Sequence, residues 1–158
     1  MSKYVDSLYK VNNNIFVFTP LLVVFYEKLT PSPKNLLLSY LVLPLVLYGK
    51  SQTTIKKSNK TSSISTFLAS NQKEKRENVY GLPERIQEYK EITNQCMLYA
   101  IGNGWIKLNE DLSVEVIKKQ NNNMVNLECA YKASSKLCNI FKDLDVVSIY
   151  RLLGVKQL

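Results

Sequence analysis

The feature that most constrains this chain is the segment Leu36–Tyr48, which holds almost no polar side chain. Between Leu36 and Leu43 the only polar residue is Ser39, so a helix formed here would be apolar on every side and must be buried all round. A helix is the preferred interpretation, although the dense Leu and Val would also suit a buried strand. Pro44 requires such a helix to end, to kink, or to restart with the proline in its first turn.

A second apolar run, Ile15–Tyr26, precedes it, and the pair raises the question of a membrane hairpin. Each run is shorter than the roughly 20 residues that a transmembrane helix needs. Pro20 and Pro44 interrupt the two runs, and a polar turn at 27–34 separates them. The lengths therefore predict two buried core segments.

Local signals predict how this first part is built. Thr19 followed by Pro20 is typical of a helix start, with Thr as N-cap and Pro at the first helical position. Ser32-Pro33 repeats the signal before the second apolar run. The composition then changes at Gly49, and residues 50–76 are rich in Ser, Thr and Lys and carry most of the formal charge of +8. Within that segment Ser62 or Ser63 is expected to cap a short helix.

The rest of the chain predicts a helix, a hairpin and two further helices. The spacing of apolar residues from 82 to 101 is helical, and Gly102-Asn103-Gly104 is expected to end that helix. The later elements are strands at Trp105–Leu108 and Val114–Ile117, a helix at 127–141, and a last helix at Val146–Leu153 that Asp143 or Asp145 caps and Gly154 closes.

These elements predict a mainly α fold with a small β-hairpin. A winged-helix-like C-terminal part, residues 79–158, would pack on an apolar N-terminal helical part, residues 1–78, whose segment 49–78 is basic and rich in Ser and Thr. The two parts are expected to form one compact unit.

Catalytic chemistry is hard to find in the sequence. The chain has no histidine, which removes the commonest general base and metal ligand. Gly102-Asn103-Gly104 precedes a strand-like run, whereas a phosphate-binding loop precedes a helix. Glu84, Glu88 and Glu91 fit a solvated helix face, and Glu110 and Asp111 fit a hairpin turn. We therefore predict that the chain is not an enzyme and has no cofactor, metal or catalytic residue of its own.

The cysteines and the N-terminus bear on the compartment. Cys96, Cys129 and Cys138 are odd in number and widely spaced, which fits neither a disulfide framework nor a zinc site. Residues Met1–Asn14 lack the apolar segment of a signal peptide. A cytoplasmic location is expected.

Two surfaces are candidates for contact with other molecules. The apolar run is either a core helix or a surface that another chain covers. In the second case, partners would also cover part of the last predicted helix. The basic stretch is either a solvated loop or a contact for nucleic-acid phosphates or an acidic protein surface. The apolar candidates are Tyr40, Leu41, Leu43, Pro44, Leu45, Leu47, Tyr48, Tyr150, Arg151, Leu152 and Leu153, and the basic candidates are Lys50, Lys56, Lys57 and Lys60.

The segments Ser32–Leu36, Tyr40–Tyr48, Tyr99–Gly104 and Ile149–Val155 carry a family resemblance. Together with the basic segment after Tyr48, they resemble the middle component of three-component ABC systems, such as the Lamassu-type defence complexes against phage and plasmids. The motifs are mainly hydrophobic, and the resemblance extends over most of the chain from about Asn14.

This resemblance implies a small non-catalytic subunit beside an SMC-like ATPase and an effector, often a nuclease. Such a subunit would help to couple DNA sensing to effector activation, with DNA reached through the complex and no membrane involved. The alternative is an independent winged-helix regulator that binds DNA through Lys50, Lys56, Lys57, Lys60 and the hairpin. The acidic residues Glu110 and Asp111 in the hairpin turn count against this alternative, because they would face phosphates.

Overall fold

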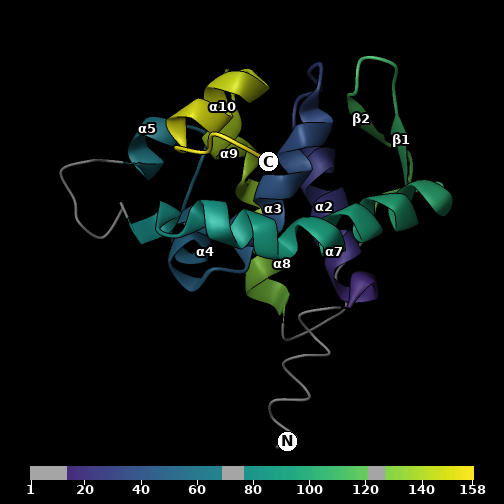
Figure 1. Cartoon of the computed structure of the whole chain (residues 1–158), viewed down its shortest axis with the longest axis horizontal. Coiled ribbons are helices and arrows are strands. Elements are labelled where there is room, and N and C mark those ends of the chain that lie inside the picture. The colour runs from purple at the N-terminus through teal and green to yellow at the C-terminus, as the bar shows by residue number, and fades with distance from the viewer. Residues whose placement is uncertain (1–13, 69–76, 121–126) are drawn as a thin grey trace, which may run out of the picture.

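The computed structural model describes residues 14–68, 77–120 and 127–158. Helices dominate this part of the chain, and one two-stranded antiparallel sheet accompanies them, as predicted (Figure 1). The elements are α2 (Ile15–Lys28), η1 (Asn35–Leu38), α3 (Ser39–Val46), α4 (Gly49–Lys56), α5 (Ile64–Phe67), η2 (Glu77–Val79), α7 (Leu82–Gly102), β1 (Ile106–Leu108), β2 (Val114–Val116), α8 (Glu128–Lys136), α9 (Cys138–Phe141) and α10 (Val146–Leu152).

Helix α2 begins one turn earlier than predicted. Asn14 is its N-cap, and the side-chain Oδ1 accepts a hydrogen bond from the Phe16 amide at 2.9 Å. Thr19 is therefore not a cap; its hydroxyl donates to the Ile15 carbonyl inside the helix. Pro20 lies in the helix interior, where its missing N–H removes the bond to the Phe16 carbonyl. The prediction was wrong because Asn14 supplies an equally good cap five residues earlier.

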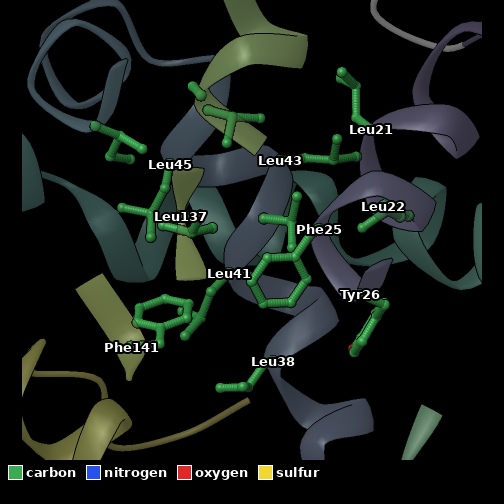
Figure 2. Packing of buried hydrophobic residues seen from close by; sticks show 14 of the residues in the cluster. Leu21, Leu22, Phe25, Tyr26, Leu38, Leu41, Leu43, Leu45, Leu137 and Phe141 are labelled. Carbon is green, nitrogen blue, oxygen red and sulfur yellow. The ribbon is translucent and has the colours of Figure 1, made fainter. Parts of the chain in front are cut away.

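Helix α3 occupies the centre of the hydrophobic core. It packs against α7, α2, α4 and α8, and its side chains from Leu41 to Val46 are buried. Figure 2 shows Leu41, Leu43 and Leu45 among side chains of α2 together with Leu137 and Phe141. Fully burying each such leucine contributes about 1.5–3 kcal/mol. This core cluster contains residues from both predicted parts of the chain, residues 1–78 and residues 79–158.

The C-terminal end of α3 lies inside the protein, where its last four carbonyl groups need partners. The amide of Leu47 donates to the Leu43 carbonyl at 3.0 Å. From the first turn of α4, the Ser51 hydroxyl donates to the Leu45 carbonyl and the Gln52 amide group donates to the Val46 carbonyl at 2.8 Å.

These bonds explain why residues 49–56 form a helix against the core rather than the solvated loop that the sequence left open.

The fourth carbonyl, that of Pro44, accepts a hydrogen bond from the Arg85 guanidinium on α7. The same guanidinium donates to the carbonyls of Asn78 at 3.2 Å and Tyr80 at 2.9 Å. It also lies 3.9 Å from the centre of the Tyr48 ring, which is cation–π distance. Burial lowers the pKa of Arg85 from its usual range, but the guanidinium stays charged because its pKa begins so high. Through these contacts Arg85 links the C-terminal end of α3 to the N-terminal end of α7.

The hairpin is bound to the N-terminal part of the chain. Ile106 pairs with Val116 and Leu108 with Val114 in the two strands. Asn35 is buried at the start of η1, and its side-chain oxygen accepts a hydrogen bond from the Val114 amide at 2.8 Å. The amides of residues 34 and 36 donate to the carbonyls of residues 111 and 112. The hairpin is confirmed, but these bonds hold its turn against η1, and the winged-helix arrangement is not established.

The remaining elements follow the prediction closely. Helix α7 crosses the width of the molecule in Figure 1 and ends at Gly102, where Gly104 adopts a positive φ of 71°. Ser63 caps α5 and Asp145 caps α10 through side-chain hydrogen bonds. One expected helix, 127–141, is instead divided at Leu137 into α8 and α9. No helix in the described ranges is both long and apolar enough to cross a membrane.

We expect Arg85→Met to destabilise the protein by about 2–3 kcal/mol, because three carbonyls lose a charged donor and the Pro44 carbonyl becomes a buried acceptor without a partner. Arg85→Lys should be intermediate, since an ammonium cannot reproduce the fork of donors. Urea denaturation followed by circular dichroism measures both. The matched control is Lys90→Met on the same helix; an Arg85→Met variant as stable as this control would contradict the role of the guanidinium.

We expect the thiols to react in the order of their exposure. Cys129 is exposed, Cys138 is half-buried and Cys96 is buried, and burial raises the pKa of Cys96 to about 11. At pH 8 a maleimide should therefore modify Cys129 first and Cys96 only after denaturation, because the thiolate is the reactive form. Peptide mass spectrometry over a time course measures this, and rapid native labelling of Cys96 would contradict the packing of α7 against α2.

Candidate partner interface

The apolar candidates from residues 40–48 lie mostly inside the protein. Leu41, Leu43, Pro44 and Leu45 are buried in the chain's own core. The structure therefore corresponds to the core-helix interpretation for these four side chains, which have no exposed surface to offer a second chain. The physical reason is that α2, α4, α7 and α8 together enclose α3 on every side.

Three candidates from the same run are half-buried at the edge of this core. Tyr40 donates a hydrogen bond from its hydroxyl to the Asn94 side-chain oxygen on α7 at 2.6 Å. Leu47 packs against the core cluster, and Tyr48 lies beneath the Arg85 guanidinium. Each of them already has a partner within the chain.

The candidates from the last helix lie at the surface. Arg151 and Leu152 are exposed, Tyr150 is half-buried, and Leu153 is buried. Asp145 starts this helix by accepting a hydrogen bond from the Ser148 amide at 2.9 Å, and Gly154, with a φ of 77°, ends it. Val146, Ile149 and Leu153 point into the core. The opposite side of α10 is therefore turned outward.

An open groove of about 570 Å³ lies beside α10, between this helix, η1 and the tail that follows. We call it the α10 groove. Its apolar walls come from η1, α10 and the tail that follows, and its two charged residues, Arg151 and Lys156, are both basic. The lining residues are Leu37, Val146, Val147, Tyr150, Arg151, Gly154, Val155, Lys156, Gln157 and Leu158.

Hydrogen bonds fix the shape of the groove. The Tyr150 hydroxyl donates to the Leu37 carbonyl and so joins α10 to η1. The Gly154 and Val155 amides donate to the carbonyls of Arg151 and Tyr150, which turns the tail back along the helix. Beyond the tail, Pro83 and Gln87 of α7 line a second hollow of about 640 Å³.

Sequence reasoning missed Val147 and Leu37, which complete the groove. Val147 is 59% exposed, which is unusual for a valine in a structured helix. One signal was available: Val146 and Val147 are adjacent in the sequence, and neighbouring residues of a helix point about 100° apart, so a narrow buried face cannot hold both. Leu37 could not have been found, because only the fold places it beside α10.

The basic candidates occupy α4 and the segment after it. Lys50 is paired with Glu77. Lys56 is half-buried, and its amine lies 3.4 Å from the Cys129 sulfur on α8. Lys57 and Lys60 are exposed. The fold therefore separates Lys50, which is paired with Glu77 of η2, from Lys56, whose amine lies beside α8.

The candidate carboxylates lie on two separate elements of the described structure, α7 and the hairpin turn. Glu84, Glu88 and Glu91 are exposed on α7. Asp111 accepts hydrogen bonds from the amide and hydroxyl of Ser113, which lower the pKa of this carboxyl in its turn. Within residues 14–68, 77–120 and 127–158, no group of three or more metal-ligating side chains is arranged to hold an ion.

The fold and the groove define a small, mainly helical protein with an open apolar groove at its surface. The family model for the ABC-three component (ABC-3C) system Middle Component 3 matches residues 2–157, and the chain belongs to this family. Its name makes the chain one component of a multi-part ABC system. No curated protein and no solved structure shows a significant match.

We expect Tyr150→Phe to reduce stability by about 1 kcal/mol at neutral pH through loss of the bond to the Leu37 carbonyl. Burial also raises the pKa of Tyr150, so the folded state holds its proton while an unfolded tyrosine loses it near pH 10. Stability from this group is complete below pH 10 and is lost as the pH rises further.

The wild type should therefore lose more stability between pH 9 and 11 than Tyr150→Phe, measured by urea denaturation. Tyr80→Phe, which changes a 76% exposed tyrosine, is the matched control. Parallel pH profiles for the wild type and Tyr150→Phe would show that the buried hydroxyl does not contribute.

Proposed function

We propose that this chain is a non-catalytic accessory subunit of a bacterial anti-phage and anti-plasmid complex of the Lamassu type. In this proposal it joins an SMC-like ATPase to an effector, a nuclease, in a cytoplasmic complex and helps to couple DNA sensing to effector activation. Membership of the middle-component family supports a place in a multi-part ABC system. The ATPase and the nuclease supply the chemistry.

The observation that carries the proposal is the α10 groove. It combines apolar walls with a preformed shape, which are the properties of a surface that receives a helix from another protein. Val147 and Tyr150 stand one helical turn apart on one side of α10, at the spacing that an apolar helix stripe can contact. Covering Val147 alone would remove an exposed apolar side chain from water.

The charges on the groove specify the kind of segment that fits. Arg151 and Lys156 are basic and no acidic residue lines the groove. A complementary partner is an amphipathic helix with an apolar stripe and acidic flanking residues, because paired opposite charges orient the helix and like charges reject others. We assign this segment to the ATPase.

The test is co-expression of the tagged chain with the ATPase and effector encoded beside it, followed by affinity purification. Val147→Glu should reduce the co-purified ATPase at least about tenfold, because it places a charge in the lining of the groove and repels acidic flanks. The fold should persist, since this side chain is largely exposed.

Ile117→Glu is the matched control, because Ile117 is 57% exposed and lies outside the groove, after β2. It should leave the ATPase bound. Equal recovery of the ATPase with both variants would show that the groove is not the interface. A stable, monodisperse wild-type monomer with no co-purifying ATPase would exclude the accessory-subunit function itself.

The alternative, an independent winged-helix regulator, receives less support. Its hairpin would have to contact DNA, yet the turn carries Glu110 and Asp111 and is hydrogen-bonded to η1. The alternative requires sequence-preferring duplex binding by the isolated chain. Equal affinity for unrelated duplexes would exclude it.

A further inference from the structure

The fold gathers lysines from two distant parts of the sequence onto one face. Three come from the end of α4 and the segment after it, two come from α8, and one is the residue that follows α9. We call this the α4–α8 lysine face, and its members are Lys56, Lys57, Lys60, Lys132, Lys136 and Lys142.

Hydrogen bonds show that the two groups of lysines are neighbours. The Lys136 amine donates to the Lys56 carbonyl at 2.9 Å, and the Lys142 amine donates to the Lys60 carbonyl. The Lys56 amine lies 3.4 Å from the Cys129 sulfur. Since Cys129, Lys132 and Lys136 recur at helical spacing on α8, Lys132 lies on the same side of this helix.

Among the residues that the structure describes, no carboxylate forms an ion pair with a lysine of this face. In the described ranges the ion pairs join Lys28 and Lys119 to Glu27 and Lys50 to Glu77, and none involves a lysine of this face. Lys57, Lys60 and Lys132 are exposed. Glu128 at the start of α8 and Asp143 after Lys142 are the carboxylates adjacent to it in sequence.

The composition of the lysine face favours nucleic acid over protein. Protein interfaces are depleted of lysine and have an apolar or aromatic centre. The large exposed apolar side chains of the described residues lie on α2, on α7 and the turn before it, on the hairpin, on α10 and at the C-terminus, and none belongs to α4, α8 or α9. Single-stranded nucleic acid is usually held by stacking on exposed aromatic rings, which these three described helices also lack.

We propose that the α4–α8 lysine face binds the phosphate backbone of duplex DNA directly and without sequence preference. Within α8 the helical rise from Lys132 to Lys136 gives a length of about 6 Å, along which a duplex carries about three to four phosphate charges. Several lysines can therefore contact phosphates at the same time. This inference deepens the proposed function and rests on it only for the role of the DNA binding, which is to let this chain take part in DNA sensing by the complex.

The experiment measures binding of the full chain to a fluorescent 24-bp duplex by anisotropy over a range of salt concentrations. Affinity should fall steeply with salt, and two unrelated sequences should bind equally, because phosphate binding carries no sequence information. The triple variant Lys57→Gln, Lys60→Gln, Lys132→Gln should weaken binding at least about tenfold at 50 mM salt. It should also reduce the salt slope by about 2–3, because each phosphate that a lysine neutralises adds about 0.9 to that slope.

The control removes the same charge from another region: Lys34→Gln, Lys107→Gln, Lys118→Gln, three exposed lysines near the hairpin. It should retain affinity within about twofold. Equal weakening by both triple variants would show an effect of net charge and would overturn the assignment to this face. Circular dichroism and thermal melts verify that both variants are folded.

Cys129 provides a reporter within the native face, since it is an exposed thiol beside Lys56. Duplex DNA should slow maleimide modification of Cys129 at least severalfold, and unchanged labelling at saturating duplex would overturn the proposal. Polyglutamate is the probe for an acidic protein partner, and equally tight, equally lysine-dependent binding of it would also overturn the choice of DNA.

These results separate this inference from the proposed function. If the triple Gln variant still co-purifies with the ATPase but the wild type binds no duplex, the DNA-binding inference fails and the subunit role stands. If duplex binding follows the lysine face but no ATPase co-purifies, the subunit role fails and the DNA-binding inference stands.

Discussion

The structure depends on burying a short apolar helix together with its C-terminal end. Helix α3 is apolar on nearly every side, so α2, α4, α7 and α8 enclose it. Burial of a helix end also buries carbonyl groups that lack partners within the helix. All four of these carbonyls are satisfied, by the Leu47 amide, Arg85, Ser51 and Gln52. The polar chain that follows α3 is folded inward to satisfy them.

This requirement also determines what remains at the surface. Because α4 must supply donors to the end of α3, its far end and the following segment lie against α8. Lys56 and Lys60 then meet Lys136 and Lys142, and a basic face results from residues about eighty positions apart. Within the apolar run, the side chains from Leu41 to Val46 lie in the core. The open apolar surface is provided by α10 and the tail, where Val147 is left outside.

Elements whose signals are local were predictable from the sequence. The helix from 82 to 101 follows from its apolar spacing and the glycines after it, and the Ser63 and Asp145 caps follow from side chains that bond within three residues. When two nearby residues are equally good N-caps, local signals cannot show which one starts the helix. For this reason Thr19, and not Asn14, was predicted to cap α2. Helix α4 was not predictable, since its partners are carbonyls of α3 and a lysine of α8.

The sequence by itself indicated that residues 36–48 need to be covered, either by the chain's own core or by another chain. It also predicted a mainly helical fold with a hairpin, and it contains no histidine. Composition and short-range periodicity are enough for such conclusions. Only the tertiary structure decided which apolar side chains remain exposed at the surface and which lysines share a face. Those outcomes depend on how helices pack against α3, and the hydrogen bonds that fix them join residues such as Leu37 and Tyr150, or Lys60 and Lys142, that are far apart in the chain.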